Sequence, residues 1–213
     1  RRPKADPRQV NDVHSRLNPA EVADVFRPKT FGDLIGTIEA HARANASLGL
    51  SGSRHAMGSQ QFASAETLLD LRGLDRILDL DAERGIVHIE AGIEWPGLLD
   101  GLLRRQRSRS TVWTVPTKQT GADRLTVGGA LAANAHGRTL TRAPMGDDVE
   151  SILLIDPSGY PLRCSREENP DLFRLALGGY GLFGPIYSAR LRLVPRTKVQ
   201  RVVTLCRREE VMS

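Results

Sequence analysis

Three stretches rich in small residues interrupt an otherwise ordinary chain of 213 residues. They are SGSRHAMGS at 51–59, TVGGALAANAHGR at 126–138 and GGYGLFGPIY at 178–187. Small side chains let a backbone approach a ligand closely, and consecutive amides at a tight turn form a nest for an anion. One such stretch is common turn chemistry, but three in one chain indicate a ligand site built largely from backbone.

The first stretch follows a predicted strand-helix-strand unit. A strand is predicted within 21–26, and Thr30 is the expected N-cap of an amphipathic helix over 31–45. A second strand over 47–52 runs directly into the loop. The loop lacks both the GxGxxG of a dinucleotide fold and the GK[ST] ending of a P-loop, so we expect a diphosphate cradle of another kind.

The second stretch is expected to open a helix of small residues. Such a helix would expose its N-terminal amides and let a flat ring system pack against its backbone. A close-packed core helix is the alternative interpretation. The third stretch lies between a predicted helix, which begins at Asn169-Pro170 with Asn169 as N-cap, and a strand over 185–195.

The remaining chain predicts mostly strands. Residues 1–20 are polar and are interpreted as an extended arm before the folded structure begins, and 104–125 as a long connection. A tight turn is expected at 83–85, and a helix from Trp95 through Leu103. The other predicted strands cover 67–71, 76–82, 85–92, 149–156 and 160–165.

Charge and cysteine content exclude several classes. The net charge is +5, but only 5% of residues are aromatic and none interleave with the arginine runs at 104–109 and 207–208. Those runs are interpreted as solvated loop, without nucleic-acid binding. Cys164 and Cys206 indicate neither a metal site nor a disulfide framework. No transmembrane segment or signal peptide is apparent, and a cytoplasmic location is expected.

The order of four motifs resembles the FAD-binding domain of the vanillyl-alcohol oxidase and para-cresol methylhydroxylase superfamily. The motifs are SGSRHAMG, LTVGGALAANAHGR, DDVESILLIDPSG and NPDLFRLALGGYGLFGPIYSARLRLVP, and the resemblance spans about residues 20–196. Within that superfamily the chain is most similar to sugar-lactone oxidases, cytokinin dehydrogenases and decaprenylphosphoryl-ribose oxidase.

The resemblance implies an α+β fold of two subdomains, with FAD extended between them. The first would be small and contain the βαβ unit, and the second would hold a larger mixed or antiparallel sheet flanked by helices. The expected divisions are an arm over 1–20, a first subdomain over 21–105, a second over 106–197, and the start of a link to a C-terminal substrate domain over 198–213.

The resemblance also carries site residues over to this chain. The first loop would give backbone amides to the diphosphate, the second would line the diphosphate and flavin, and Ile186 would contact the adenosine half. The implied cofactor-binding residues are Gly52, Ser53, Arg54, His55, Ala56, Thr126, Val127, Gly128, Gly129, Asn134, His136, Gly137 and Ile186.

Two histidines leave alternatives open. Covalent members of the family bond the flavin through a histidine in a Gly-His-Ser context, and His55 stands here between Arg54 and Ala56. Both a covalent link and a non-covalent loop role remain for His55, with the covalent link not favoured. His136 either contacts the cofactor or bonds the loop backbone.

The implied activity is an FAD-linked oxidase or dehydrogenase that takes a hydride from a CH–OH donor such as an alcohol, sugar or lactone. A general base is usually needed as well, and in this family it comes from a substrate domain, so no catalytic residue is assigned. The expected partners are a small-molecule substrate and either a substrate domain or a partner subunit. The alternative is a nucleotide-binding or FAD-binding subunit without independent activity.

Overall fold

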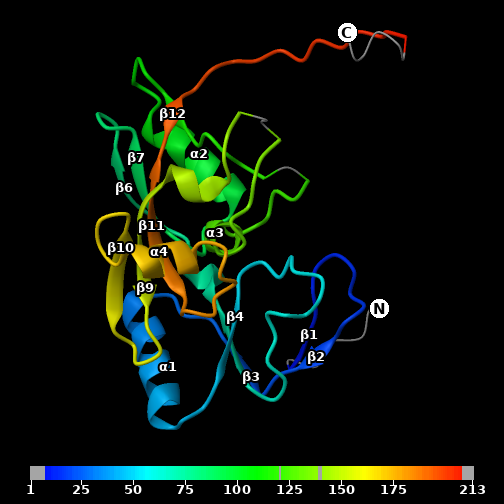
Figure 1. Ribbon diagram of the computed structural model, residues 1–213, viewed down its shortest axis with the longest axis vertical. Coiled ribbons are helices and arrows are strands. Elements are labelled where there is room, and N and C mark those ends of the chain that lie inside the picture. The colour runs from blue at the N-terminus through cyan, green and yellow to red at the C-terminus, as the bar shows by residue number, and fades with distance from the viewer. Residues whose placement is uncertain (1–7, 120, 139–140, 208–213) are drawn as a thin grey trace.

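The computed structural model describes residues 8–119, 121–138 and 141–207. It contains helices and several sheets, which confirms the expected α+β class (Figure 1). A three-stranded parallel sheet in the order β3-β5-β4 lies beside a five-stranded antiparallel sheet in the order β10-β9-β11-β7-β6. The parallel strands are β3 (Asp24–Phe26), β4 (Leu48–Ser51) and β5 (Thr67–Asp70).

Helix α1 (Phe31–Arg43) connects β3 to β4 and confirms the predicted helix. Thr30 caps its start, because the Thr30 hydroxyl accepts from the Asp33 amide while the Asp33 carboxylate accepts from the Thr30 amide. The side chains of Leu34 and Ile38, four residues apart, are buried on one face. This strand-helix-strand unit places the carboxyl ends of β3, β4 and β5 at one edge of the parallel sheet.

The antiparallel sheet confirms the predicted strands and the hairpin of β9 and β10. The antiparallel sheet also includes β6 and β7, which lie within the range 21–105 expected for the first subdomain. The chain therefore passes from the parallel sheet to the antiparallel sheet between β5 and β6. Its strands are β6 (Ile77–Asp81), β7 (Ile86–Glu90), β9 (Val149–Ile155), β10 (Pro161–Ser165) and β11 (Ile186–Arg192).

The remaining elements pack around the two sheets. The buried residues of β7, β9 and β11 form one core with Trp95, Leu98 and Leu131. These elements are helices α2 (Trp95–Arg105), α3 (Val127–Ala132) and α4 (Pro170–Ala176), the 3₁₀ turns Leu71–Gly73 and Met145–Asp148, and the short strands β1 (Gln9–Val10), β2 (Ala20–Glu21), β8 (Trp113–Thr114) and β12 (Val194–Pro195).

A buried carboxylate locks β7 to β11. The Arg76 guanidinium donates two hydrogen bonds to the Glu90 carboxylate, at 3.1 and 2.8 Å, and the Tyr187 hydroxyl donates a third at 3.1 Å. Burial alone would raise the pKa of Glu90. The hydrogen bonds from Arg76 and Tyr187 together lower it by more than burial raises it, so the pKa of Glu90 lies below the usual value. The carboxylate is therefore held ionised inside the fold.

Two expectations about the N-terminal arm and the start of α4 are wrong. Folded structure begins before residue 20, because β1 pairs with β2 and Val10 is buried. Asn169 does not cap α4, since its side chain makes no cap hydrogen bond and its backbone is left-handed at φ 49°. The long connection predicted over 104–125 is present, although α2 extends into it as far as Arg105. Buried Gln106 anchors it by exchanging two hydrogen bonds with the Trp113 backbone.

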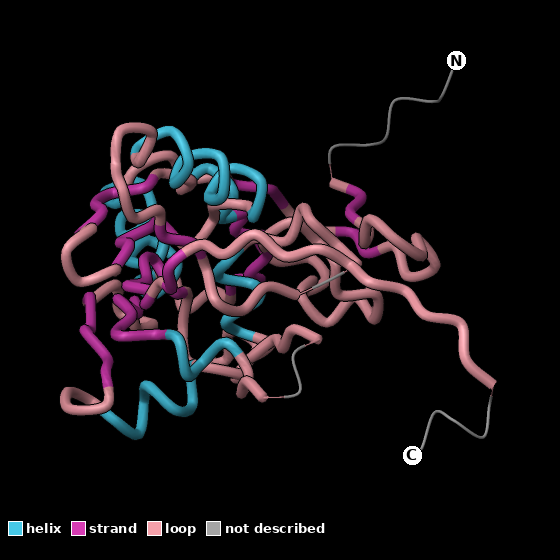
Figure 2. Tube along the Cα trace, turned by 90° about the horizontal axis from the view of Figure 1, so that it is seen from above, coloured by secondary structure: helices cyan, strands magenta, loops and turns pink. Residues whose placement is uncertain are grey.

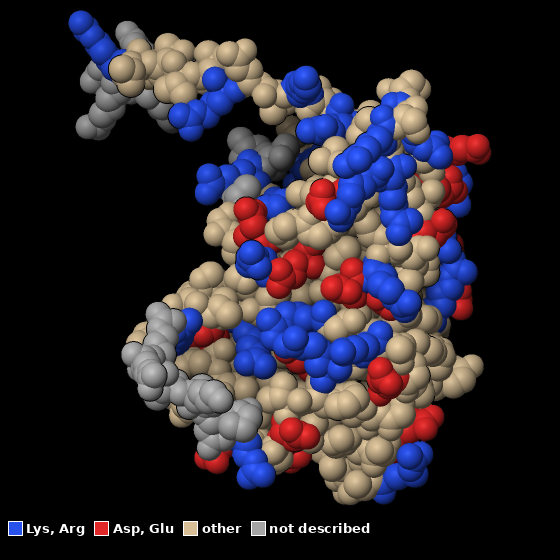
Figure 3. All heavy atoms as spheres, turned by 180° about the vertical axis from the view of Figure 1, so that it is seen from behind, with Lys and Arg blue, Asp and Glu red and all other residues tan. Residues whose placement is uncertain are grey.

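The outer surface carries mixed charge. Lys and Arg side chains form a band across the face in Figure 3, with carboxylates interspersed. Arg104 is not part of a loop, because it lies in the last turn of α2 and pairs with Asp100 at 2.7 Å. Seen from above, the β1–β2 pair lies at the rim of the body and the segment after β12 runs away from it (Figure 2). No helix in the described ranges is both long and apolar enough to span a membrane.

Candidate functional site

The first glycine loop leaves β4 at the carboxyl edge of the parallel sheet. The amides of residues 53–56 donate no hydrogen bond to any other residue that the structure describes. Arg54 has a left-handed backbone at φ 59°, a conformation that side chains other than glycine seldom adopt. A turn of free amides of this kind suits an anion.

The second stretch forms α3, with Thr126 as its N-cap. Its first amides are not exposed, contrary to the sequence prediction. Val127 donates to the Ile93 carbonyl at 2.8 Å, Gly128 donates to the Ala91 carbonyl at 2.7 Å, and Gly129 donates to the Thr126 hydroxyl. Carbonyls near the end of β7 therefore occupy the helix N-terminus, so α3 offers a ligand its small-residue surface rather than its amides.

The third stretch joins the other two. Gly178 and Tyr180 donate to the carbonyls of Leu131 and Ala132 at the end of α3. A β-carbon added at Gly181 would lie 3.2 Å from the Leu50 side chain of β4. The three stretches, distant in sequence, are thus held against one another.

A cavity of about 990 Å³ lies among the three stretches. This volume is at the upper end of the range for small-molecule sites. Two predicted residues do not line the cavity. Val127 is fully buried in the core, and the Asn134 side chain accepts a hydrogen bond from the Gly146 amide. The predicted residues that do line it are Gly52, Ser53, Arg54, His55, Ala56, Thr126, Gly128, Gly129, His136, Gly137 and Ile186.

Three residues of the cavity lining carry buried polar atoms without a hydrogen-bond partner in the described chain. They are the Ser51 hydroxyl, the Arg54 Nε and the Gln61 side-chain oxygen. Buried polar groups are normally satisfied, so these atoms indicate that a polar ligand completes the site. The lining contains no Asp, Glu or Lys, and its titratable side chains are Arg54, His55, His136 and Tyr180. A diphosphate-bearing cofactor fits this donor set and charge.

Both histidines of the site have identifiable roles. His55 Nε2 lies 3.1 Å from the Arg124 carbonyl, and a carbonyl only accepts, so Nε2 carries the hydrogen. His55 Nδ1 then accepts from His14 Nε2 at 2.6 Å. Burial, the largest cause, and His14 lower the pKa of His55, which favours its neutral form. His136 Nδ1 donates to the Gly137 carbonyl at 2.8 Å and also lines the cavity, so it bonds the loop as one alternative expected.

The N-terminal arm also contacts the first loop, and this contact was not predicted from the sequence. Residues 12–18, here called the arm clasp, contact residues 54–59 at four points. These are Val13 N–H to the Arg54 carbonyl at 3.0 Å, His14 to His55, the Asn18 side-chain Nδ2 to the Met57 carbonyl at 3.0 Å, and the Ser59 hydroxyl to the Asn18 carbonyl.

Asp12 folds the arm clasp. Its buried carboxylate accepts from the amides of His14, Ser15 and Arg16 at 2.6–3.0 Å. Burial alone would raise the pKa of Asp12. These hydrogen bonds and one from the Ser15 hydroxyl together lower it by more, so the pKa of Asp12 lies below the usual value. The DVHS segment at 12–15 is the usual signal for such a turn, since Asp caps amides two and three residues on.

Ser51, Gln60, Gln61 and Gln119 are further lining residues that were not among the predicted cofactor-binding residues. Ser51 ends β4 and Gln61 donates to the Ala56 carbonyl at 3.0 Å, so both belong to the first loop. Polar residues flanking a glycine loop were the available signal. No group of three or more His, Cys, Asp or Glu in the described ranges could hold a metal ion.

Comparison with known proteins identifies the family of the chain. A family model described as FAD binding domain matches residues 22–165. That range includes the first two stretches, α3 and the β9–β10 hairpin. It covers more than half of the chain, which is sufficient to assign the family.

Several curated proteins are similar to the chain. An uncharacterized oxidoreductase from the fasciation locus of Rhodococcoides fascians is 31% identical over 79% of the chain and 37% of its own length. The rice mitochondrial L-galactono-1,4-lactone dehydrogenase 2 is 31% identical over 61% of the chain and 21% of its length. Rice cytokinin dehydrogenase 2 is 31% identical over 83% and 32%. The chain thus spans about a fifth to two fifths of these relatives.

Proposed function

The chain belongs to the FAD-binding domain family of the vanillyl-alcohol oxidase and para-cresol methylhydroxylase flavoproteins, and from that premise we propose that it is the FAD-binding part of an oxidoreductase. The proposed reaction is hydride transfer from a CH–OH donor, an alcohol, sugar or lactone, to the flavin. The observation that supports it best is the convergence of the three small-residue stretches on one cavity with unpartnered polar atoms.

The chain's residues would divide the work of holding FAD. The free amides of residues 53–56 would bind the diphosphate. Gly128 and Gly129 line the cavity, and their lack of side chains would let the cofactor approach α3 closely. Gly128 also lets α3 pack on the segment after β7, because a β-carbon at 128 would meet Ala91 within 3 Å. Ile186, buried at the start of β11, would contact the adenosine half.

When bound, FAD supplies two-electron redox chemistry, and the protein supplies orientation, charge and exclusion of water. The bases that line the described cavity are His55 and His136, and each has one ring nitrogen bonded to a backbone carbonyl. We propose that the base for the substrate hydroxyl comes from a substrate domain or partner subunit rather than from this lining.

An absorbance spectrum of the purified chain tests the proposal. We expect the visible bands of oxidised flavin, or their appearance after FAD is added and excess is removed. Folded protein that remains colourless and takes up no FAD would contradict it. A panel of alcohols, sugars and lactones, supplied anaerobically to the full-length protein, then tests the donor class through bleaching of those bands.

The second candidate is an FAD-binding subunit without activity of its own. The described cavity lining favours keeping it, because both of its histidines have a ring nitrogen bonded to a backbone carbonyl. Such a subunit would be reduced by dithionite and reoxidised in air, yet no donor of the panel would bleach it in the full-length protein. Bleaching by any one donor would exclude this candidate.

We propose that the flavin is bound without a covalent link. Both ring nitrogens of His55 already bond protein groups, and a link would displace one of these bonds. Acid precipitation of the yellow protein should leave the colour in the supernatant. Colour in the pellet of wild type that is lost from the pellet of His55→Asn, but not of His136→Asn, would establish a histidyl link.

A further inference from the structure

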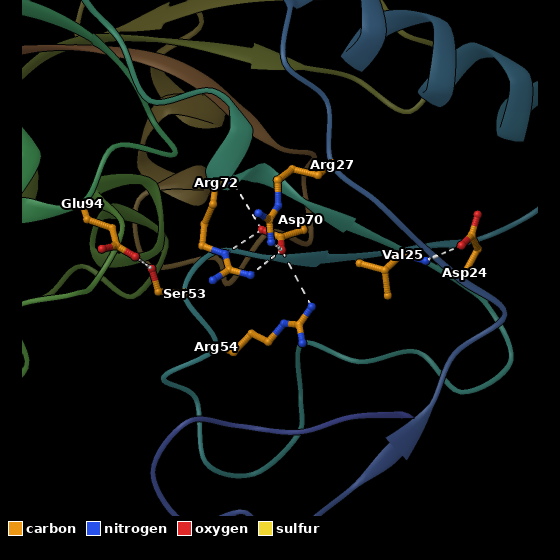
Figure 4. A network of polar contacts seen from close by, with 8 residues as sticks. All are labelled: Asp24, Val25, Arg27, Ser53, Arg54, Asp70, Arg72 and Glu94. Atoms are coloured by element: carbon orange, nitrogen blue, oxygen red, sulfur yellow. Dashed lines mark hydrogen bonds and ion pairs between the residues drawn. The ribbon is translucent and has the colours of Figure 1, made fainter. Parts of the chain in front are cut away.

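Asp70 gathers three arginines at the edge of the parallel sheet where the cofactor loop begins. Its carboxylate is fully buried, and the side chains of Arg27, Arg54 and Arg72 all point toward it (Figure 4). The ion pairs measure 2.7 Å to Arg27, 3.7 Å to Arg54 and 2.6 Å to Arg72. One negative charge is therefore shared by three positive ones.

The topology explains this convergence. Asp70 ends the central strand β5, and each arginine follows a different strand of the parallel sheet. Arg27 comes directly after β3, Arg54 follows β4 and Arg72 follows β5. Ligands of parallel sheets bind beyond the carboxyl ends of the strands, so the cluster lies on the edge where an anion is expected.

The three arginines are not equally engaged. Arg27 donates one hydrogen bond to Asp70 and Arg72 donates two side-chain hydrogen bonds, whereas Arg54 donates none to any residue in the described ranges. Arg54 Nε is buried without a partner, and only Arg54 of the three lines the large cavity. Among the three, the Arg54 guanidinium is thus the one held without a hydrogen bond, by the 3.7 Å ion pair with Asp70 and by the Phe62 ring, whose centre lies 6.0 Å away.

The charge around the cluster is net positive, which suits an anion such as a diphosphate. Arg27, Arg54 and Arg72 outnumber the Asp70 carboxylate, and they also outnumber it when Glu94 is added, which accepts from Ser53 at 2.8 Å and interacts with Arg72. Burial, the largest cause, lowers the pKa of Arg54, and Arg72 and Arg27 add to that effect. A bound anion would relieve this unfavourable arrangement.

We propose that the Arg54 side chain contacts the diphosphate of the bound cofactor, in addition to the loop amides, and that Asp70 is a positioning residue for it. Asp70 holds Arg27 and Arg72 beside the site and restrains Arg54 through the 3.7 Å ion pair. This inference rests on the proposed function, because it assumes that FAD occupies the cavity.

Calorimetric titration with three probes tests the role of Arg54. FAD and ADP both carry a diphosphate, whereas riboflavin carries none. For Arg54→Gln we expect affinity for FAD and for ADP to fall about 10- to 100-fold, the range for one charge-assisted hydrogen bond, with riboflavin unchanged. The matched control is Arg84→Gln, which removes an arginine paired with Glu150 outside the cavity lining and should change no affinity.

The outcomes separate the two proposals. If wild type takes up no FAD, the proposed function fails. If wild type binds FAD but Arg54→Gln binds FAD and ADP as tightly as Arg84→Gln does, only the present inference fails. An equal loss for riboflavin would also overturn it, since the variant would then have damaged the cavity rather than the diphosphate contact.

Asp70→Asn distinguishes positioning from simple charge. Removing the carboxylate makes the cluster more positive, so an effect of charge alone would tighten ADP binding. A positioning role predicts instead that ADP binding weakens several-fold while riboflavin binding is kept. If Asp70→Asn does not fold, Asp70→Glu replaces it, because that variant keeps the charge but shifts the carboxylate. Unchanged ADP affinity in Asp70→Glu, or tighter binding in Asp70→Asn, would overturn the positioning role.

Discussion

Gly52 lies so close to Thr126 that a β-carbon at position 52 would stand 2.1 Å from the Thr126 hydroxyl oxygen. The hydroxyl has little freedom to move, because it accepts from the Gly129 amide at 3.2 Å as the cap of α3. The first and second glycine stretches therefore touch at this point, and the absence of a side chain at 52 sets their separation.

Gly52→Ala should separate the two stretches. The added methyl group must displace Thr126 and disturb the cap of α3, at a cost of about 1–3 kcal/mol in unfolding free energy. FAD affinity should fall with it, because Gly52 and Thr126 both line the cavity. Urea unfolding and FAD titration measure the two effects.

The control is Gly36→Ala on the exposed face of α1, where an added β-carbon has nothing within 4 Å. That variant should be neutral or more stable by about 0.5–1 kcal/mol, since alanine favours a helix over glycine. Equal behaviour of the two variants would show that the contact at Gly52 has no structural role.

The Thr126 hydroxyl should matter more to the site than the Thr126 methyl group. Thr126→Val removes the cap and should cost about 0.5–2 kcal/mol, whereas Thr126→Ser keeps the oxygen and should cost less. Hydrogen exchange of the α3 amides together with FAD titration measures the difference. If valine and serine were equally disruptive, packing of the methyl group rather than capping would be the cause.

The arm clasp gives a prediction about the first loop. Asp12→Asn should weaken the turn that presents Val13 and His14 to the loop, because an amide oxygen is a poorer acceptor than a carboxylate. We expect faster hydrogen exchange of residues 53–57 and FAD release accelerated several-fold. Asp24→Asn is the matched control, since the exposed Asp24 side chain accepts only from the adjacent Val25 amide. Identical hydrogen exchange in both variants would show that the arm clasp does not stabilise the first loop.

Local patterns predicted the elements that carry the site. Small residues, alternation and caps are properties of neighbouring residues, so β4, α1, β7 and the hairpin of β9 and β10 follow from sequence. The family resemblance, which rests on the order of the motifs, supplied thirteen candidate residues, and eleven of them line one cavity in the structure. Their roles as FAD ligands stay predictions.

The features that were missed depend on contacts between distant segments. The amides of α3 are satisfied by Ala91 and Ile93, which lie in another part of the chain. The arm has no period, yet Val10 is buried against Val22 and Leu68. The Asp70 cluster requires three strands to end at one edge, and no local pattern states which arginines meet there.

His55 should make folding stability depend on pH. Its pKa lies below the ordinary value of 6.5, mainly through burial and further through His14, although the Arg124 carbonyl and Glu94 oppose this shift. The unfolded chain therefore takes up the proton first as pH falls. Stability contributed by neutral His55 is complete above pH 6.5 and declines as pH drops from there toward the folded pKa.

Thermal unfolding of wild type and His55→Gln between pH 8 and pH 5 measures this effect, and the stability advantage of wild type should shrink as pH falls, over roughly that range. The comparison variant is His88→Gln, because burial and Arg190 also lower the pKa of His88. It should show the same trend but keep wild-type FAD affinity, since His88 lies on β7 outside the cavity lining. A constant difference between wild type and His55→Gln across the range would mean that His55 is not held neutral in the folded protein.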